Sequence, residues 1–443
     1  MSRGYAYIVL GAGKQGMAAA FELALFGRAS TVTVADASLP LARAAVDRLQ
    51  SLIGKELKQN GTTLRSRRVD GRRATDLAKA IDGHRGAFSA LPYFLNPAAA
   101  RAAIASGAHY VDLGGHFDTT QEILKLERGA QKSGVTVTPD CGVAPGLCNV
   151  LAARGIEQLD RADEVRMYCG GLPQHPHPPL GYKLVFSMEG VLGNYFGKSY
   201  ELREGRVVLV PSFERREELD FGPPLGRLEG VVTGGATSTC PWTYEGRVRS
   251  YSYKTLRYPG HFEKIQALKD LGLLDAEPIR VDGQWVSPRR LFIKLAEERL
   301  RFPGERDLLV MRVTVRGTKG GAPTEIAYNL LEYEDVKTGF SAMQRTTGFP
   351  AAIVLEMLVQ GEVAKPGVVP IEKLVPPKTY WTSSNAAASK SPKPSRPPKP
   401  GRRPNRAGPP ARTETPGPPR PTPDRGSPTA RDRAAPPRRN SKP

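Results

Sequence analysis

Residues 6–16 read AYIVLGAGKQG, and they give the strongest indication of the fold of the N-terminal half of the chain. The apolar run at 6–10 predicts a buried strand, and glycines follow it at the spacing G-x-G-x-x-G, at Gly11, Gly13 and Gly16. In such a turn the first glycine permits the tight bend, the second lets a pyrophosphate approach the backbone, and the third lets helix and strand touch. Because a helix N-terminus attracts anions, the stretch predicts a dinucleotide-binding turn that also includes Lys14 and Gln15.

The same alternation continues to about residue 145. Further strand-like apolar runs lie at 31–35, 87–91, 109–113 and 135–139, with a weaker one near 64–69. Segments with helical periodicity lie between them, at 15–26, 40–58, 74–82, 97–106 and 118–133. Apolar strands separated by helices are typical of parallel β-α-β units whose sheet is covered on both faces. We expect an α/β fold here, a doubly wound parallel sheet of the Rossmann type.

The pattern changes between about residues 163 and 343. Strand-like segments with partial period-two alternation lie at 164–170, 182–188, 251–258, 308–317 and 325–335. The last two predict a hairpin with Gly320 and Gly321 in its turn. Helices are expected at 261–273, 287–301 and, after the domain, 350–360. This mixture without β-α-β regularity predicts a second, α+β domain with a mixed sheet.

These patterns divide the chain into four parts. We expect the Rossmann domain at 1–145 and the α+β domain at 146–345. A helix and an extended segment at 346–383 should pack back against the first domain, and a basic, proline-rich tail fills 384–443.

The composition separates the globular body from this tail. The chain has 443 residues and a net charge of +20, and residues 384–443 hold 15 Lys+Arg against 3 Asp+Glu, a net +12. The tail also holds 17 of the 40 prolines and no aromatic residue, so it cannot bury enough apolar surface to fold. We expect a disordered extension; its contact with nucleic acid, an acidic partner or a proline-reading domain is a weaker alternative.

Several classes of protein are excluded at this level. No apolar run approaches the ~18–20 residues that cross a bilayer, and the N-terminus has no secretory pattern. The four cysteines form no C-x-x-C pair, and the six histidines have no zinc spacing with them. The stretch 170–182 holds two histidines and four prolines and is expected to be a rigid loop. A reduced, cytoplasmic protein with no metal and no membrane contact is the expectation.

Asp36 closes the second predicted strand, 20 residues after Gly16. At this spacing its carboxylate can accept a hydrogen bond from the ribose 2′-hydroxyl of adenosine. A 2′-phosphate would be repelled there, and Ala37 and Ser38 supply no arginine to bind it, so the sequence favours NAD over NADP. Asp70 ends the third strand, where it either lies near the adenine or is an ordinary turn residue.

Three later strand ends should line up at the carboxyl edge of the sheet, where such folds bind ligands. They are 91–93, 112–116 and 140–146. We assign Leu91 and Pro92 to the cofactor and Tyr93 to the substrate. His116 is the first candidate for proton transfer, because an unperturbed histidine titrates near neutrality, and Asp140 is the second. A histidine unrelated to chemistry is the alternative.

The second domain contributes TLRYPGH at 255–261, in which Arg257 and His261 flank a proline turn before a helix. An arginine and a histidine at a helix start suit a carboxylate, through a planar fork and a favourable dipole. A solvated arginine with a capping histidine is an equal alternative on spacing alone. Cys141 and Cys148 are seven residues apart, which is no dithiol spacing, so both are expected to be small buried residues.

Taken in order, several motifs resemble the saccharopine dehydrogenase family, closest to its L-lysine 6-dehydrogenase branch. They are GAGKQG, YVDLGGH, PDCGVAPG, GGLP, TGGATST and YKTLRYPGH, and the likeness covers about residues 5–380. The departures are Cys141, the proline-rich loop at 170–182, and the basic tail.

This resemblance implies a Rossmann domain followed by an α+β domain that mediates dimerisation and covers the active site. It implies NAD-dependent oxidation of a side-chain amine, most simply L-lysine to 2-aminoadipate 6-semialdehyde, which cyclises to a piperideine carboxylate. A saccharopine or carboxynorspermidine-type NAD(P)-linked dehydrogenase is the alternative, and a noncatalytic dinucleotide-binding protein is a second. The matching motif residues are Gly11, Gly13, Gly16 and Asp36 for the cofactor, and His116, Asp140, Arg257 and His261 around the site.

Overall fold

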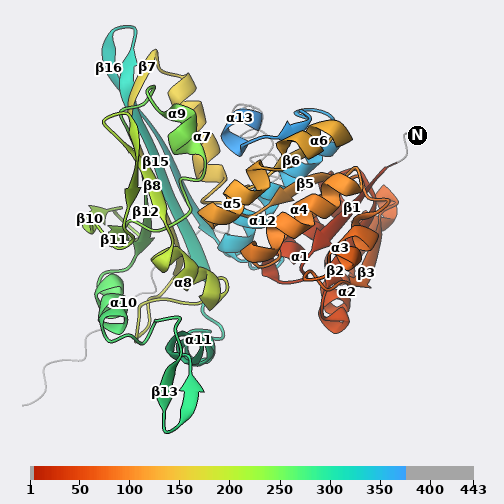
Figure 1. Ribbon diagram of the computed structural model, residues 1–443, viewed down its shortest axis with the longest axis horizontal. Helices are drawn as coiled ribbons and strands as arrows, with labels where there is room; N and C mark the ends of the chain where they lie inside the picture. The colour runs from red at the N-terminus through yellow and green to blue at the C-terminus, as the bar shows by residue number, and fades with distance from the viewer. Residues whose placement is uncertain (1–3, 376–443) are drawn as a thin grey trace, which may run out of the picture. The chain divides into compact units, whose positions relative to one another are not determined.

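The computed structural model describes residues 4–375, and the proposed tail at 384–443 lies outside this part of the chain. Seven strands form a sheet in the order β17-β6-β5-β4-β1-β2-β3, and every neighbouring pair is parallel (Figure 1). The strands are β1 Tyr5–Leu10, β2 Ala29–Asp36, β3 Thr63–Arg68, β4 Gly86–Ser89, β5 His109–Asp112, β6 Thr136–Thr138 and β17 Gly367–Val368. The predicted Rossmann-type sheet is confirmed.

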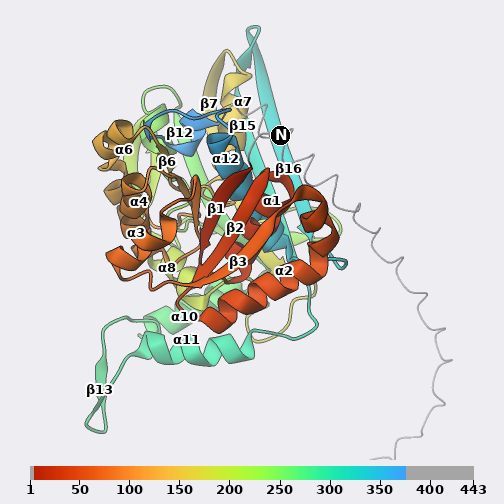
Figure 2. The ribbon, with the colours of Figure 1, turned by 90° about the vertical axis from the view of Figure 1, so that its right-hand side faces the viewer.

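Helices cover both faces of this sheet (Figure 2). The helices α1 Lys14–Phe26, α2 Leu39–Asn60 and α12 Ala342–Val359 share one apolar core, and α3 Ala74–Ile81 and α4 Asn96–Ala105 contribute to another. The helix expected at 118–133 is two helices, α5 Phe117–Leu124 and α6 Glu127–Ser133. Residues two apart in one helix cannot share a face, and the break lets both Leu124 and Leu126 contact the core.

The second sheet is mixed, as predicted. Its path is β10-β11-β12-β7-β15-β16, with β8 and β9 attached beside β12; the β7–β12 pair is parallel and the other pairs are antiparallel. The strands are β7 Arg161–Pro173, β8 Ser199–Arg203, β9 Arg206–Val210, β10 Glu217–Asp220, β11 Arg227–Val231, β12 Ser250–Arg257, β15 Asp307–Lys319 and β16 Ala322–Tyr333. Gly320 and Gly321 both have positive φ and form the predicted turn between β15 and β16.

Shorter elements surround this sheet. Helices α7 Leu147–Glu157, α8 Met188–Phe196, α9 Cys240–Tyr244, α10 His261–Asp270 and α11 Pro288–Arg299 lie between strands of the chain, and α13 Ile371–Leu374 follows β17. A separate hairpin consists of β13 Ile279–Val281 and β14 Gln284–Val286.

Two sequence predictions about elements were wrong. Residues 182–188 form no strand, because the backbone there bonds to the end of α11: the amide of Leu184 donates to the carbonyl of Leu300. The helix expected at 350–360 begins at Ala342 instead, with Pro350 in its interior. The longer helix forms because Ser341 and Gln344 build a capping box at its start.

Helix α12 holds the N-terminus of α1 in place. The side-chain amide of Gln344 donates to the carbonyl of Lys14 at 2.7 Å, and that of Gln15 donates to the carbonyl of Met343 at 3.3 Å. A Cβ on Gly348 would lie 2.8 Å from the Cβ of Ala18, so the two helices pack closely there with only the alanine methyl group between them. The domain boundaries at 145, 345 and 383 stay predictions.

Within residues 4–375, no helix combines the length and the apolar character that a bilayer crossing requires.

The buried carboxylate of Asp307 should be a measurable support of α12. Its two oxygens accept hydrogen bonds from the amides of Ala342 and Met343, at 2.7 and 3.0 Å. Asp307→Ala should lower the free energy of unfolding by about 2 kcal/mol, because two helix N-terminal amides lose their acceptor. Urea unfolding followed by circular dichroism checks this, with Asp82→Ala at an exposed site as the control. Equal midpoints for Asp307→Ala and wild type would contradict it.

Candidate functional site

The glycine turn between β1 and α1 has the geometry of a dinucleotide cradle. Gly11 has φ +99°, and a Cβ on Gly16 would lie 1.8 Å from the carbonyl oxygen of Gly11, so neither position accepts a side chain. A Cβ on Gly13 would meet nothing within 4 Å, and Gly13 is exposed. The middle glycine therefore faces the open space that a pyrophosphate would fill.

The helix that follows this turn offers free donors. No side chain caps α1, which begins at Lys14 directly after Gly13. The first amides of a helix have no acceptor within the helix, and together with the dipole they attract an anion. Lys14 and Gln15 both lie in this first turn. The residues present thus fit the diphosphate of a nicotinamide dinucleotide.

Asp36 is fixed beside the turn by two backbone donors. Its carboxylate accepts from the amides of Ala12 and Ser38, both at 2.9 Å. The strand pairing also sets Arg68 of β3 directly opposite Asp36. The residues that follow Asp36 in the sequence include no arginine, because Arg68 is its neighbour across the sheet and not along the chain. Asp70 bends the chain after β3, where it accepts from the amide of Arg72 at 3.0 Å.

Tyr93 and His116 come together at the carboxyl edge of the sheet. Their rings stack with centroids 4.5 Å apart and an interplanar angle of 9°. Tyr93 opens a short 3-10 helix after Leu91 and Pro92, and His116 directly precedes α5. The Nδ1 atom of His116 lies 3.3 Å from the hydroxyl of Thr119. The stack fixes the plane of the imidazole while both residues stay partly exposed.

Two buried carboxyl groups, those of Asp112 and Asp140, lie close to the loop that carries His116. One oxygen of Asp112 accepts from the amides of Gly114 and Asp140, at 2.8 and 3.1 Å. Among the described residues, the Oδ2 atom of Asp112 and the Oδ1 atom of Asp140 have no hydrogen-bond partner. Burial, and then the charge of Asp140, raises the pKa of Asp112 to about 7, and burial also raises the pKa of Asp140.

The second domain contacts the loop that carries His116 directly, through the TGGATST segment, residues 233–239. The hydroxyls of Ser238 and Thr120 both donate to the Oδ2 atom of Asp140, at 2.5 and 2.9 Å. A Cβ on Gly235 would lie 2.5 Å from the carbonyl oxygen of Gly115, so the two backbones are in contact. Asp140 therefore joins the first domain, α5 and the second domain.

Aromatic contacts strengthen the same closure. Phe117, the residue after His116, has its ring centroid 4.3 Å from that of Tyr200 and 4.9 Å from that of Trp242. Beside them, the Lys198 ammonium pairs with Asp118 at 3.0 Å. The loop that carries His116 is thus fixed to the second domain on one side and to the sheet on the other.

Arg257 and His261 belong to a separate buried chain of hydrogen bonds. Burial, and then the charge of Arg257, lowers the pKa of His261 to about 3, so its ring is neutral. Its Nδ1 atom lies 3.0 Å from the carbonyl of Leu180 and must donate to it. The Nε2 atom therefore accepts from the hydroxyl of Tyr195 at 2.8 Å, and Tyr195 in turn accepts from the Nε atom of Arg257 at 3.0 Å.

The predicted site residues thus fall into three groups. The glycine turn with Asp36 is one, the Tyr93–His116 stack above Asp140 is the second, and Arg257 with His261 is the third. Within residues 4–375, no hydrogen bond or ring contact joins Arg257 or His261 to the second group. The second and third groups are connected through the backbone. The amide of Gly234, in the TGGATST segment, donates to the carbonyl of Asn194 in α8, the helix that also carries Tyr195.

Sequence reasoning missed several residues that build these groups. Asp112 and Ser238 lie inside motifs that the sequence had singled out, DLGGH and TGGATST, so their presence there was the available signal. Thr120, Tyr195 and Arg68 lie in no such motif. Their roles follow from side chains that meet across 20 or more residues of chain, which local patterns do not encode.

Two family models match the chain. The saccharopine dehydrogenase NADP binding domain matches residues 7–138, and the saccharopine dehydrogenase C-terminal domain matches residues 142–383. The first match contains the glycine turn, Asp36 and Arg68, and the Tyr93–His116 stack. The second contains Ser238, Arg257 and His261.

Relatives and a solved structure agree with these models. The mitochondrial alpha-aminoadipic semialdehyde synthase of Bos taurus is 26% identical over 394 residues, which cover 72% of this chain and 41% of that protein. This chain therefore spans about two fifths of that relative. The saccharopine dehydrogenase (NADP(+), L-glutamate-forming) of Schizosaccharomyces pombe is 23% identical over 367 residues, 66% of this chain and 80% of that protein.

The fold is similar to that of a solved enzyme. The apo saccharopine dehydrogenase (L-Glu forming) from Saccharomyces cerevisiae superposes with a TM-score of 0.67 at 21% identity, covering 87% of this chain and 98% of that chain. At this identity the likeness establishes the arrangement of the two sheets and not the chemistry.

The pKa of Asp112 has a consequence for stability. Because folding raises this pKa from 3.8 to about 7, the native state binds the proton more tightly than the unfolded chain does. The resulting stability is complete below pH 4 and is lost as the pH rises through 7. Asp112→Asn keeps the acceptor oxygen without titrating, so it should lose less stability between pH 5 and pH 8.

At pH 8 the variant should be more stable than wild type by an amount on the order of 4 kcal/mol, because each unit of pKa difference corresponds to about 1.4 kcal/mol. Chemical unfolding at both pH values measures this, and Asp82→Asn, at an exposed site, should keep the wild-type pH dependence. A steeper pH dependence in Asp112→Asn would show that the sign is wrong.

Proposed function

Since the chain belongs to the saccharopine dehydrogenase family, we propose that it is a nicotinamide-dependent dehydrogenase that oxidises the side-chain amine of an amino acid. The favoured substrate is L-lysine and the favoured cofactor is NAD. The products are 2-aminoadipate 6-semialdehyde, which cyclises to a piperideine carboxylate, with ammonia and NADH.

The observation that carries the choice of substrate is the single buried cation. Among the described residues, Arg257 is the one lysine or arginine that is buried, at 4% exposure. Its guanidinium lies 4.7 Å from the ring centroid of Tyr182 and is held by Tyr195. A substrate with one carboxylate suits one buried guanidinium, whereas saccharopine carries further carboxylates that require further cations.

Each of the chain's own groups then has a role in the reaction. Bound NAD supplies the acceptor for the hydride. Arg257 binds the substrate carboxylate and so fixes which carbon faces the cofactor. The substrate amine must lose a proton before it can be oxidised, and His116, held in plane by Tyr93, accepts that proton. His116 releases this proton to solvent, then accepts a proton from the water that adds to the iminium carbon and returns it to the nitrogen, which leaves as ammonia.

Asp140 is the second choice for the base. Its carboxylate already accepts from Ser238 and Thr120 and is buried, which favours a role in holding the loop of His116 in place. The second domain, closing on this loop, excludes bulk water from the reaction.

A saccharopine-type reaction is the second candidate. The names of the matched relatives favour it, since the relative from Schizosaccharomyces pombe is an NADP(+)-linked, L-glutamate-forming saccharopine dehydrogenase. A carboxynorspermidine-type dehydrogenase and a noncatalytic dinucleotide-binding protein are the remaining alternatives. A homodimer or higher homo-oligomer and a cytoplasmic location stay predictions.

Formation of the reduced cofactor at 340 nm tests the proposal directly. L-Lysine, saccharopine, L-ornithine and no substrate are compared, each with NAD and with NADP. Reduction of NAD that depends on L-lysine is the expected result. Activity with saccharopine alone would replace the proposal by the second candidate. Absence of activity with every substrate, with NAD binding intact, would favour a noncatalytic dinucleotide-binding protein.

Substitution of His116 tests the mechanism within this assay. His116→Gln should lower kcat by about a hundredfold or more, because the proton acceptor is lost while the chain still folds. His84→Gln is the matched control, because His84 precedes β4 and so lies at the opposite edge of the sheet. An unchanged kcat in His116→Gln would remove His116 from the mechanism and leave the family assignment standing.

The neighbours Asp36 and Arg68 test the choice of cofactor. Asp36→Ala should lower kcat/KM for NAD roughly tenfold to a hundredfold, because a charge-assisted hydrogen bond to the ribose is lost. The same substitution should raise kcat/KM for NADP. Asp47→Ala, exposed on α2, should change neither value. If NADP is instead the natural cofactor, Arg68→Ala will lower kcat/KM for NADP alone, because the 2′-phosphate loses its cation.

A further inference from the structure

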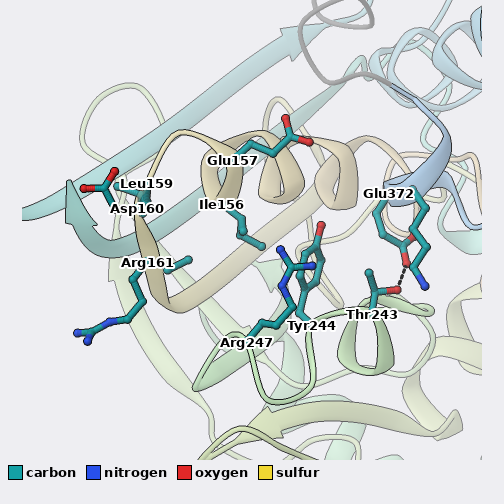
Figure 3. Close-up of a pocket in the computed structure, with 11 residues that line it drawn as sticks. Ile156, Glu157, Leu159, Asp160, Arg161, Thr243, Tyr244, Arg247 and Glu372 are labelled. Carbon is teal, nitrogen blue, oxygen red and sulfur yellow. Dashed lines mark hydrogen bonds between the residues drawn. The ribbon is translucent and has the colours of Figure 1, made fainter. Parts of the chain in front are cut away.

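A cleft far along the chain from the dinucleotide turn lies between the end of α7, the start of β7, α9 and α13 (Figure 3). Its volume is about 660 Å³. Ligand pockets of proteins usually measure about 300–1,000 Å³, so a small molecule fits. The mechanism proposed above uses none of the residues that line this cleft.

Glu372 supplies a carboxylate at one end of the cleft. The residue is 7% exposed, and its Oε1 atom accepts from the hydroxyls of Thr239 and Thr243, at 2.8 and 2.6 Å. Its Oε2 atom has no hydrogen-bond partner anywhere in residues 4–375. A buried carboxylate oxygen without a partner is costly, and a cationic donor from a ligand would relieve that cost.

Arg247 supplies the opposite charge. Figure 3 shows its guanidinium beside Tyr244, and the distance from its Cζ atom to that ring centroid is 5.6 Å. Arg247 is exposed and forms no ion pair with any residue in the described part of the chain. A free guanidinium fork suits a carboxylate.

The remaining lining residues indicate the overall charge of the ligand. Arg161 is already paired with Asp163 at 2.9 Å, and Asp160 accepts from the amide of Gly320 at 2.6 Å. The charges of the other two lining residues, Glu157 and Lys373, offset each other, so Glu372 and Arg247 set the charge that a ligand meets. Between the charged ends, Ile156 and Tyr244 provide an apolar surface. A molecule that carries both charges on a short aliphatic stem matches this lining better than a purely anionic or cationic one.

We propose that this cleft binds a small zwitterion of the amino-acid type. Its ammonium group bonds the free oxygen of Glu372, its carboxylate bonds Arg247, and its aliphatic part lies on Ile156 and Tyr244.

The position of Glu372 links the cleft to the candidate catalytic loop. Glu372 accepts from Thr239, and the adjacent Ser238 donates to Asp140. The charge of Glu372 is also among the causes that raise the pKa of Asp140, after burial. An ammonium group bound at Glu372 would offset that charge, so occupancy of the cleft acts on Asp140 and on the loop that it supports.

Isothermal titration of the full-length chain with L-norleucine tests the proposal. This probe has the α-ammonium and α-carboxylate but no side-chain amine to oxidise, so the measurement needs no turnover. L-Norleucine should bind at least tenfold more tightly than hexanoate or hexylamine, which each carry one of the two charges. Arg247→Ala and Glu372→Gln should each raise Kd about tenfold, and Arg249→Ala, an exposed arginine paired with Glu204, should leave Kd unchanged.

Arg257→Lys separates this cleft from the proposed substrate site. If norleucine binding weakens in Arg257→Lys and not in Arg247→Ala, the probe occupies the substrate site and the proposal is overturned. Absence of binding, or equal binding of hexanoate, would overturn it as well. Because no arm depends on oxidation of lysine, failure here is distinct from failure of the proposed function.

Discussion

The Oδ2 atom of Asp140 accepts hydrogen bonds from two hydroxyls that come from different parts of the molecule. Thr120 donates from α5 of the first domain, and Ser238 donates from the segment of the second domain that lies on the same loop. The backbone of Asp140 adds a third connection, because its amide donates to Asp112 at the end of β5. This carboxyl group therefore fixes the position of the loop that holds His116 against both sheets, and the proposed proton transfer depends on that position.

The placement of charge in the interior divides the site into two kinds of environment. Asp112 and Asp140 lie together in the described interior without an ion pair to either, so burial raises the pKa of both. Arg257 lies in another buried region, where it holds its charge among tyrosine rings and lowers the pKa of His261. The neutral His261 can then orient Tyr195, which orients the guanidinium. A carboxylate from a substrate would complete this second environment, since the arginine has no acidic partner among residues 4–375.

The cofactor turn depends on residues far along the chain as much as on its own glycines. Gly16 can touch Gly11 only because neither carries a side chain, which is a local property. The helix that follows is held by Gln344 and Gly348 of α12, more than 320 residues later in the chain. The last described helix, α13, returns beside Thr239 through Glu372. The C-terminal part of the described chain thus supports both ends of the proposed site.

The parallel sheet, the glycine turn, the mixed sheet with its Gly320–Gly321 hairpin and the motifs that line the site could all be predicted from the sequence. These features depend on periodicity and on the conformational freedom of glycine, which are properties of neighbouring residues. The prediction failed for the segment 182–188, where a bond to Leu300 decides the outcome. It also failed for the start of α12, which the capping box of Ser341 and Gln344 and the distant acceptor Asp307 fix together. Three contacts could be known only from the folded chain: Arg68 lies beside Asp36, Ser238 bonds Asp140, and Tyr195 connects Arg257 to His261. Each of these contacts joins residues more than 30 apart in the chain, and packing of the whole fold, not the local pattern, brings such residues together.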